Sequence, residues 1–536
     1  MAEKNASIIT DVEQAYPDCL HDESRRMGHA DGIAFPVTVQ DVCDVLKDAA
    51  GQGMPVTVQG ARTGVAGGAV PESGLVLSLE RMDRILGARF DDAGQALIRV
   101  QPGLKLSALR SVLEGGAVDQ SEWSNVSREA FECLRNERWM FTPDPTETSA
   151  TLGGMVACNA SGACSFAHGA TREHVQSLVV ALADGDVIAL ERHVAFAQGL
   201  HFELTTRGGR KLAGELPKYA MPDVKNASGY HVQPDMDLME LFIGSEGTLG
   251  VIVEMELILH PRPPVTWGVM CFLGDEVHAL DLVEWSRNPA QHGTARPVAV
   301  EFFDHNVLEM LRQARQAGAR LPVLKPAWRQ AVYLEYSAAN EEKAAALGSA
   351  VAHWLSAKGI LTDDSWVATC EDDLARLKAF RHAAPEQVNL RIAERQRIHP
   401  GLTKLGTDLA VPDAYLRSIM AMYRRDLVEA RLEYVIFGHI GNNHLHVNIL
   451  PRDADEYEKG RALYEAWARQ VVAWGGSISA EHGVGKLKTN LLQVMYGLDG
   501  VAQMRAVKKA FDPDGRLNPG DLFSTNIAPA ASSQAG

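Results

Sequence analysis

The sequence predicts an α+β protein with more than one domain, and three features of the chain carry that prediction. The chain has 536 residues, which exceeds the size at which one hydrophobic core stops growing. Residues 36–260 alternate short apolar runs with glycine-rich turns and a few helical stretches, which is an α+β pattern. Three prolines within residues 261–264 then exclude a continuing helix or central strand, and a second α+β region follows.

The elements of the first region are predicted from apolar periodicity and from the residues at their ends. Asp41 precedes one helical pattern and Gly51 follows it, as expected of helix-capping residues. Residues 119–140 resemble an inserted, partly helical loop. The predicted strands are 56–59, 75–79, 96–100 and 179–183, and the predicted helices are 42–50 and 104–114.

The second region repeats the alternation of strands and helices and ends in longer helices. A short strand is expected at 477–480, after a helix that a pair of glycines ends. The other predicted strands are 267–272, 298–303 and 330–336, and the predicted helices are 276–287, 306–318, 340–358, 372–394, 455–474 and 491–511.

Bulk composition limits the function classes. A formal net charge of -16 argues against nucleic acid as a partner, because phosphates require a basic surface. The N-terminus has no signal-peptide pattern, and no apolar run is long enough to cross a membrane. Seven scattered cysteines form no CxxC, so they are expected to be reduced thiols of a cytoplasmic protein, without disulfides or an iron–sulfur site.

A glycine-rich loop is the first candidate binding feature. The strand at 56–59 runs into glycines at 60, 64, 67 and 68, whose backbone N–H groups could surround a pyrophosphate. Arg62 would add charge and Thr63 a hydroxyl donor. The loop lacks the ending of a Walker A motif, and no helix follows it directly as in a Rossmann fingerprint. Spacing alone leaves a pyrophosphate loop and a plain glycine-rich hairpin equally open.

Three more segments combine glycine with other small residues, at 142–162, 169–173 and 243–252. Each alone could be a structural turn. Together with the loop after residue 59 they repeat one theme, backbone that can pack flat against a large planar group. A stacked flavin explains this better than four unrelated turns.

These four segments, in this order, resemble the FAD-binding domain of the vanillyl-alcohol oxidase type of flavoprotein. The resemblance spans about residues 30–522 and is nearest to the D-lactate, glycolate and D-2-hydroxyglutarate dehydrogenases. It implies a two-subdomain, PCMH-type FAD-binding domain over 1–262 and an α+β substrate domain over 263–490. A helical segment over 491–523 is expected to return to the FAD domain, and 524–536 is expected to be a disordered tail.

The resemblance also implies which residues contact a non-covalently bound FAD. The glycine-rich loop has no histidine or cysteine for covalent attachment, and His168 stands where relatives usually have an aromatic residue. The implied contacts are Gln59, Gly60, Ala61, Arg62, Thr63, Gly64, Gly67, Gly68, Asp144, Thr151, Gly153, Gly154, Asn159, Gly162, Gly169, Glu246, Gly250, Ile252 and Asn518.

A histidine-rich segment at 439–448 is the second candidate feature. Residues after Asn443 alternate between polar and apolar, as in a strand. If Asn442 and Asn443 form a two-residue turn, His439 pairs with His446, and opposed residues have Cβ atoms about 5 Å apart. Two imidazoles at that spacing could bind one metal ion.

The neighbouring residues Glu481 and His482 complete this candidate site. Two histidines, a carboxylate and open positions suit a catalytic metal, and His482 is the natural base. Taken singly, each histidine is better explained by a hydrogen bond in the core or by a solvated hairpin. Taken together they indicate a metal site, with zinc favoured by the ligand set and Mn²⁺ or Fe²⁺ as alternatives.

The same resemblance assigns roles here. It implies His439, His446 and Glu481 as metal ligands, His482 as the base and Asn448 as a substrate contact. His444 departs from the family pattern and could be an extra ligand, a second base or a residue without function.

Two further residues are candidates for the substrate's carboxylate. Arg381 resembles the family's carboxylate-binding arginine, and its planar fork suits that task better than lysine. Lys404 precedes an Asp-x-x-x-Pro segment as a lysine does in relatives, although its spacing is off by about two residues.

The predicted function is FAD-dependent oxidation of a 2-hydroxy acid to the 2-oxo acid, with hydride transfer to flavin N5 and metal-assisted proton abstraction. An external acceptor such as a quinone, a cytochrome or an electron-transfer flavoprotein is implied, and a homodimer is possible. Two alternatives stay open, a transferase like alkyl-dihydroxyacetone-phosphate synthase and a metallohydrolase.

Overall fold

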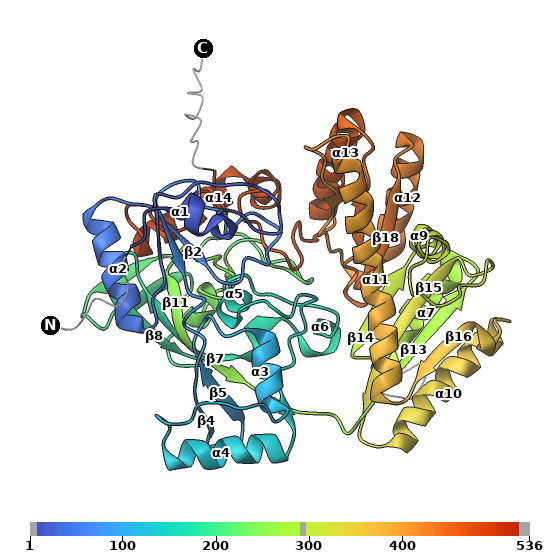
Figure 1. Cartoon of the computed structure of the whole chain (residues 1–536), viewed down its shortest axis with the longest axis horizontal. Coiled ribbons are helices and arrows are strands. Elements are labelled where there is room, and N and C mark those ends of the chain that lie inside the picture. The colour runs from blue at the N-terminus through green and yellow to red at the C-terminus, as the bar shows by residue number, and fades with distance from the viewer. Residues whose placement is uncertain (1–7, 290–295, 525–536) are drawn as a thin grey trace.

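The computed structural model describes residues 8–289 and 296–524, which form two lobes (Figure 1). We call residues 8–262 and 483–524 the N-terminal lobe, and the described residues between 263 and 482 the C-terminal lobe. Residues 525–536, where the sequence predicts a disordered tail, lie outside the described residues. Among the described residues, no helix has both the length and the apolar character that crossing a membrane requires.

A small parallel sheet begins the N-terminal lobe, with strands in the order β1 (Gly32–Ala34), β3 (Leu75–Ser78) and β2 (Val56–Gln59). Helix α2 (Val39–Gly51) contributes Val42, Val45 and Leu46 to the core beside it. Thr38 caps this helix and forms a capping box with Asp41, so the predicted cap at Asp41 is wrong. The helix begins earlier because Asp41 serves as the third residue of its first turn.

A five-stranded antiparallel sheet forms the second half of this lobe. Its order is β4 (Ile85–Phe90), β5 (Ala96–Val100), β11 (Val251–Ile258), β7 (Val175–Ala181) and β8 (Val187–Glu191). The segment predicted as an insertion contains α4 (Asn125–Asn136), which lies below β4 in Figure 1. The remaining elements of the lobe are α1 (Val12–Ala15), α3 (Leu106–Leu113), β6 (Trp139–Met140), α5 (Leu152–Ala157), α6 (Ser165–His168), β9 (His201–Thr205), β10 (Lys211–Glu215) and β12 (His260–Pro261).

The C-terminal lobe is built on one seven-stranded sheet with helices packed against it (Figure 1). Its strand order is β16 (Ser365–Ala368), β13 (Val265–Leu273), β15 (Gln330–Ala338), β14 (Ala299–Phe303), β18 (Tyr434–Gly438), β19 (His446–Ile449) and β17 (Leu405–Gly406). Its helices are α7 (Glu276–Arg287), α9 (His305–Gln316), α10 (Glu341–Ala357), α11 (Glu371–Gln396), α12 (Leu416–Ala430) and α13 (Ala454–Ala473). Each predicted helix of this region is present.

The strand predicted at 477–480 is wrong, because this segment makes only one bridge, from Ser477 to Ala410. Serine side chains replace the expected ladder. The hydroxyl of Ser477 donates to the backbone carbonyl of Ser479, and the hydroxyl of Ser228 in the N-terminal lobe bonds both the Ser477 hydroxyl and the backbone of Ser479, so the segment is held as a connection between the lobes.

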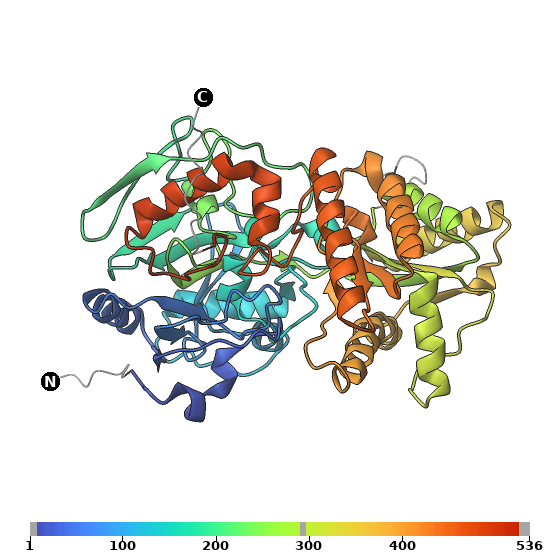
Figure 2. The ribbon, with the colours of Figure 1, turned by 90° about the horizontal axis from the view of Figure 1, so that it is seen from above.

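The chain then returns to the N-terminal lobe. The backbone N–H groups of Val484 and Gly485 donate to the carboxylate of Glu246, so the return precedes the predicted boundary after residue 490. Helix α14 (Thr489–Phe511), which bends at Gly497, lies on the N-terminal lobe in both views (Figures 1 and 2). Leu517 extends the parallel sheet by a bridge to Val56.

Candidate active site

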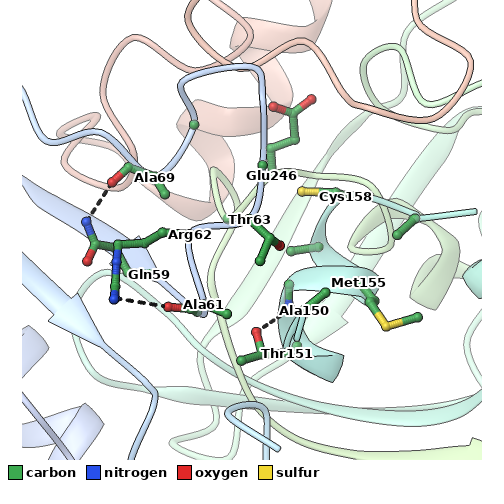
Figure 3. A pocket seen from close by; sticks show the side chains of 18 of the residues that line it. Gln59, Ala61, Arg62, Thr63, Ala69, Ala150, Thr151, Met155, Cys158 and Glu246 are labelled. Carbon is green, nitrogen blue, oxygen red and sulfur yellow. Dashed lines mark hydrogen bonds between the residues drawn. The ribbon is translucent and has the colours of Figure 1, made fainter. Parts of the chain in front are cut away.

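A cavity of about 360 Å³ lies where the glycine-rich loop faces the segment 150–161. Figure 3 shows Arg62 and Thr63 of the loop on one side and Thr151 and Met155 on the other, with Glu246 above them. The residues with predicted FAD contacts that line it are Gln59, Gly60, Ala61, Arg62, Thr63, Gly64, Gly68, Thr151, Gly153, Gly154, Glu246, Gly250, Ile252 and Asn518.

Close approach of two backbone segments explains the glycines of this cavity. A Cβ atom on Gly60 would lie 2.1 Å from Oγ1 of Thr151, and one on Gly153 would lie 2.5 Å from Cβ of Pro102. A Cβ on Gly64 would meet nothing within 4 Å. Gly64 also lines the cavity, so it is a loop glycine whose missing side chain is not required by a neighbouring segment.

The polar atoms of the cavity fit a ligand with many hydrogen-bonding groups. Ser161 Oγ, Gln59 Oε1, Asp22 Oδ2 and Asp521 Oδ2 are buried, line the cavity and have no protein partner. Buried polar atoms without partners are costly. The ribityl and ribose hydroxyl groups and the ring N–H groups of FAD could donate to the three oxygen acceptors, and the hydroxyl of Ser161 could donate to the cofactor, so the residues present fit FAD.

Five residues with predicted FAD contacts do not line this cavity: Gly67, Asp144, Asn159, Gly162 and Gly169. Asp144 forms an ion pair with Arg110 at 3.1 Å and lines a second cavity of about 830 Å³ between the lobes. Gly162 accommodates the carbonyl oxygen of Asp144, which would lie 1.6 Å from a Cβ atom. The loop that contains Asp144 contributes lining residues to both cavities.

The histidine segment is not the two-residue hairpin that the sequence predicts. Phe437, and not His439, pairs with His446, and a 3₁₀ turn at Ile440–Asn442 lies in the connection. Asn443 takes the left-handed conformation with φ 51°, which asparagine tolerates. The longer connection still brings the rings of His439 and His446 together, with centroids 5.5 Å apart.

Four histidines surround the carboxylate of Glu481. Nε2 of His439 lies 3.3 Å from Oε2, and Nε2 of both His446 and His482 faces Oε1, at 3.5 Å and 3.3 Å. Nδ1 of His444 lies 3.8 Å from Oε2. The ligand atoms of His439, His444, His446 and Glu481 all lie within 4.8 Å of one another, as a site for one metal ion requires.

Two carboxylates that the sequence analysis missed complete this group. Glu301 on β14 accepts from Nδ1 of His439 at 2.6 Å, and Oδ1 of Asp408 lies 2.9 Å from Nε2 of His444. Both carboxylates are almost fully buried. A signal for Glu301 existed, since it is the one charge in an otherwise apolar strand, and a buried charge needs a partner.

Lys225 was also missed, and it comes from the other lobe. Its ammonium donates to Oε2 of Glu481 at 2.6 Å and lies 3.4 Å from Nδ1 of His444. Burial alone would raise the pKa of Glu481, but Lys225 and His439 hold it well below the usual value. Without a metal the site therefore contains a cation already paired with its central carboxylate.

The pKa of His482, the predicted base, is under opposing influences. Burial lowers its pKa, but the carboxylates of Asp408 and Glu481 outweigh this and raise the pKa to about 9. Nδ1 of His482 lies 3.4 Å from Oδ1 of Asp408. Lys488 donates to the other oxygen of Asp408 at 2.7 Å and so fixes this carboxylate.

The three other predicted catalytic residues differ in their placement. Arg381 is buried on α11, with Nε 3.8 Å from Oε2 of Glu301, so it lies beside the histidines. Asn448 is buried on β19, two residues after His446. Lys404 is exposed and donates to Asn389, and it does not join the group.

The two candidate features share one cavity. Glu481 and His482 line the same cavity as Gly60 and Gly154, although they are separated from them by hundreds of residues in sequence. Of the predicted metal-ligating and catalytic residues, only Glu481 and His482 line it, so an electron acceptor bound along the loop and a substrate beside this pair would meet in one space.

Two sequence families match the chain. The family described as FAD linked oxidases, C-terminal domain, matches residues 280–522, and the FAD binding domain family matches residues 30–128 and 124–191. The first match covers the histidine segment and Glu481, and the second covers the glycine-rich loop.

Full-length relatives agree with these matches. A D-2-hydroxyglutarate dehydrogenase of Xanthomonas citri pv. viticola is 29% identical over 93% of this chain and 90% of its own length. A probable mitochondrial D-lactate dehydrogenase of Danio rerio is 28% identical over 94% and 87%. Among solved structures, p-cresol methylhydroxylase superposes with a TM-score of 0.64 at 15% identity, covering 98% of this chain and 95% of that one.

Proposed function

Because the chain belongs to the FAD-linked oxidase family of the vanillyl-alcohol oxidase type, we propose that it oxidises a 2-hydroxy acid to the 2-oxo acid at the shared cavity. FAD would be held along the glycine-rich loop, and a divalent cation by His439, His446 and Glu481. The observation that carries this proposal is the joint lining of one cavity by Gly60, Gly154, Glu481 and His482.

The relatives narrow the substrate class. Their names, D-2-hydroxyglutarate and D-lactate dehydrogenase, support a D-2-hydroxy acid as substrate. The sequence has no Rossmann fingerprint for NAD and no cysteine pattern for an iron–sulfur cluster, so electrons would leave to an external acceptor such as a quinone, a cytochrome or an electron-transfer flavoprotein.

Each polar side chain of the site would have a defined task. Bound FAD would supply the two-electron acceptor, and a divalent cation would supply Lewis acidity. Arg381 would bind the substrate carboxylate, since its fork suits two oxygens and it lies beside the histidines through Glu301. Asn448 would offer an amide to the substrate from the same strand as His446.

His482 would move the proton. Oδ1 of Asp408 lies 3.4 Å from Nδ1, which favours a proton on that nitrogen and would leave Nε2 to take the proton of the substrate hydroxyl. A pKa of about 9 makes His482 a protonated, poor base at neutral pH. Engagement of Glu481 by a cation would remove one of the two causes of that raised pKa, which is a physical reason for the site to need a metal.

The test is anaerobic reduction of the bound flavin by D- and L-2-hydroxy acids, with absorbance near 450 nm as the readout. We expect bleaching by D-2-hydroxy acids, its loss after chelation and recovery with added metal. His482→Asn should slow bleaching at least about 100-fold with FAD still bound, whereas His201→Asn, an exposed residue that contacts Glu215, serves as the matched control.

Two results would contradict the proposal. Protein purified without flavin absorbance would favour the metallohydrolase alternative. Unchanged bleaching after complete removal of metal, or in His482→Asn, would remove the cation and the base from the reaction while leaving FAD binding intact.

A further inference from the structure

We propose that His444 is a third imidazole ligand, so that the cation site consists of three histidines and one carboxylate. This inference rests on the cation site of the proposed function and deepens it. It concerns a position where the sequence left three roles open. The evidence is the arrangement that His444 shares with His439 and His446.

The three rings have the same two-sided arrangement. One nitrogen of each faces an outer acceptor: Glu301 for His439, Asp408 for His444 and the carbonyl oxygen of Thr407 for His446, at 2.6, 2.9 and 3.2 Å. The other nitrogen of each faces Glu481, at 3.3, 3.8 and 3.5 Å. Metal-ligating histidines characteristically donate their second N–H to a carboxylate or backbone carbonyl. His439 and His446 make this outer hydrogen bond, whereas Nε2 of His444 lies 2.9 Å from Asp408 without hydrogen-bond geometry, so His444 shares the placement of the other two rings and needs only a small rotation to share the bond.

The contact with Lys225 indicates which nitrogen of His444 offers its lone pair. The ammonium of Lys225 has only protons to donate, and it lies 3.4 Å from Nδ1 of His444. Nδ1 therefore acts as the acceptor, and the ring proton belongs on Nε2, next to Asp408. The same ammonium bonds Glu481, so a positive charge already lies between the two groups that we assign to the metal.

The other two roles for His444 conflict with its position. A second base must reach the substrate, but His444 is fully buried and does not line the cavity, whereas His482 does. A purely structural histidine would not need to face the same carboxylate that His439 and His446 face. The ring centroids of His439, His444 and His446 lie 4.5–5.5 Å apart, so the three rings surround Glu481.

A second combination of ligands, Asp408 with His446 and His482, also has its atoms within 4.8 Å of one another. It is the weaker candidate because Asp408 is already engaged. Its Oδ2 accepts from Lys488, from the hydroxyl of Ser479 and from the backbone N–H of His482, and its Oδ1 accepts from the backbone N–H of Glu481. A cation there would have to displace these donors.

The larger ligand set has a chemical consequence. Catalytic zinc sites usually have three protein ligands and keep the fourth position open, so four protein ligands would close a tetrahedral site. A cation that accepts six ligands would keep two positions for the hydroxyl and carboxylate oxygens of a 2-hydroxy acid. The set therefore favours a cation that accepts six ligands, such as Fe²⁺ or Mn²⁺, over zinc.

The test uses the FAD-loaded protein, stripped of metal and reloaded with Mn²⁺. X-ray absorption at the manganese edge should count three imidazoles in the unsubstituted protein and two in His444→Asn. Titration followed by the electron paramagnetic resonance of free Mn²⁺ should give at least about a tenfold weaker dissociation constant for His444→Asn. His201→Asn should bind Mn²⁺ as the unsubstituted protein does.

The outcomes separate this inference from the proposed function. Mn²⁺ bound by two imidazoles in the unsubstituted protein overturns the assignment of His444 and leaves the two-histidine site intact. If the unsubstituted protein binds neither Mn²⁺ nor Zn²⁺, both the assignment of His444 and the metal site of the proposed function are overturned. The count on the unsubstituted protein needs no variant, so it decides the question even where His444→Asn folds poorly.

Discussion

At the scale of single residues, the site depends on side chains that never touch the cavity. Glu301 is buried on β14 and accepts from Nδ1 of His439 at 2.6 Å. Although burial favours protonation, His439 and Arg381 lower the pKa of Glu301, so it remains a carboxylate. A charged acceptor on one ring nitrogen orients the ring and increases the basicity of the other nitrogen. Glu301 is thus a positioning residue for His439.

We therefore expect Glu301→Gln to weaken metal binding by about 10- to 100-fold. The amide keeps the shape of the side chain but loses the charge. Asp304→Asn is the matched control, because Asp304 follows the same strand, is equally buried and pairs with Arg424 outside the site. Metal titration of both variants checks this, and equal loss of affinity in the two would mean that general destabilisation is the cause.

At the scale of elements, two glycines of the glycine-rich loop differ in what their missing side chains allow. Gly60 allows a neighbouring segment to pack closely, whereas we expect Gly64 to allow the cofactor to bind. Gly60 is held against Thr151, so a side chain there would disturb the fold itself. Gly64 has open space where its Cβ would lie, yet it lines the cavity. This difference allows FAD binding to be tested separately from folding.

Gly64→Val should lower FAD affinity at least about tenfold, or about 1.4 kcal/mol, because the new side chain fills space that the cofactor would use. The melting temperature of the FAD-free protein should change little. Gly401→Val, in a loop of the other lobe where a Cβ also meets nothing, is the control. A FAD affinity of Gly64→Val equal to that of the control would exclude this loop from the cofactor site.

His174, just before β7, and His260, on β12, form a histidine pair in the N-terminal lobe. Nδ1 of His174 lies 3.0 Å from Nε2 of His260, and burial lowers the pKa of His174 to about 4. The folded protein holds His174 neutral, whereas the unfolded chain protonates it near pH 6.5. Its contribution to stability is therefore complete above pH 6.5 and is lost as the pH falls from 6.5 toward 4.

At pH 5 this one group should cost about 2 kcal/mol of unfolding free energy relative to pH 7.5. His174→Gln should flatten that part of the pH profile, because glutamine does not titrate. Denaturant unfolding at a series of pH values measures the effect, with His201→Gln, an exposed histidine, as the control. If the unfolding free energy of His174→Gln falls between pH 6.5 and 4.5 as steeply as that of the unsubstituted protein, His174 is not the cause of this pH dependence.

At the scale of the whole molecule, the site forms only where the two lobes meet. Lys225 of the N-terminal lobe pairs with Glu481 of the C-terminal lobe, and both side chains are at most 9% exposed. Breaking a buried pair by removing one partner commonly costs about 3–5 kcal/mol, because the other charge is left unpaired. A metal on Glu481 would supply the missing positive charge.

Lys225→Met should therefore destabilise the metal-free protein by about 3–5 kcal/mol and bind metal more tightly than the unsubstituted protein. Thermal unfolding with and without metal measures both effects, since binding to the folded state raises stability. Lys211→Met removes an exposed ion pair with Glu203 and should change neither the stability of the metal-free protein nor its metal affinity. Equal stabilisation by metal in Lys225→Met and the unsubstituted protein would mean that Lys225 does not compete for Glu481.

The sequence by itself determined the features that depend on local pattern. Helix α7, strands β2 and β5, the glycine-rich loop and the Glu481-His482 pair follow from periodicity, capping and motifs of neighbouring residues. The family resemblance extended these to the fold and to FAD, as the domain matches confirm.

Only the tertiary structure decided which distant residues surround the site. Glu301 lies 138 positions from His439 and Lys225 lies 256 from Glu481, so no local pattern links them. The pairing of His446 with Phe437 likewise depends on how β18 and β19 pack in their sheet. Burial makes each of these charges costly alone, and folding resolves that cost by bringing partners together from separate parts of the chain.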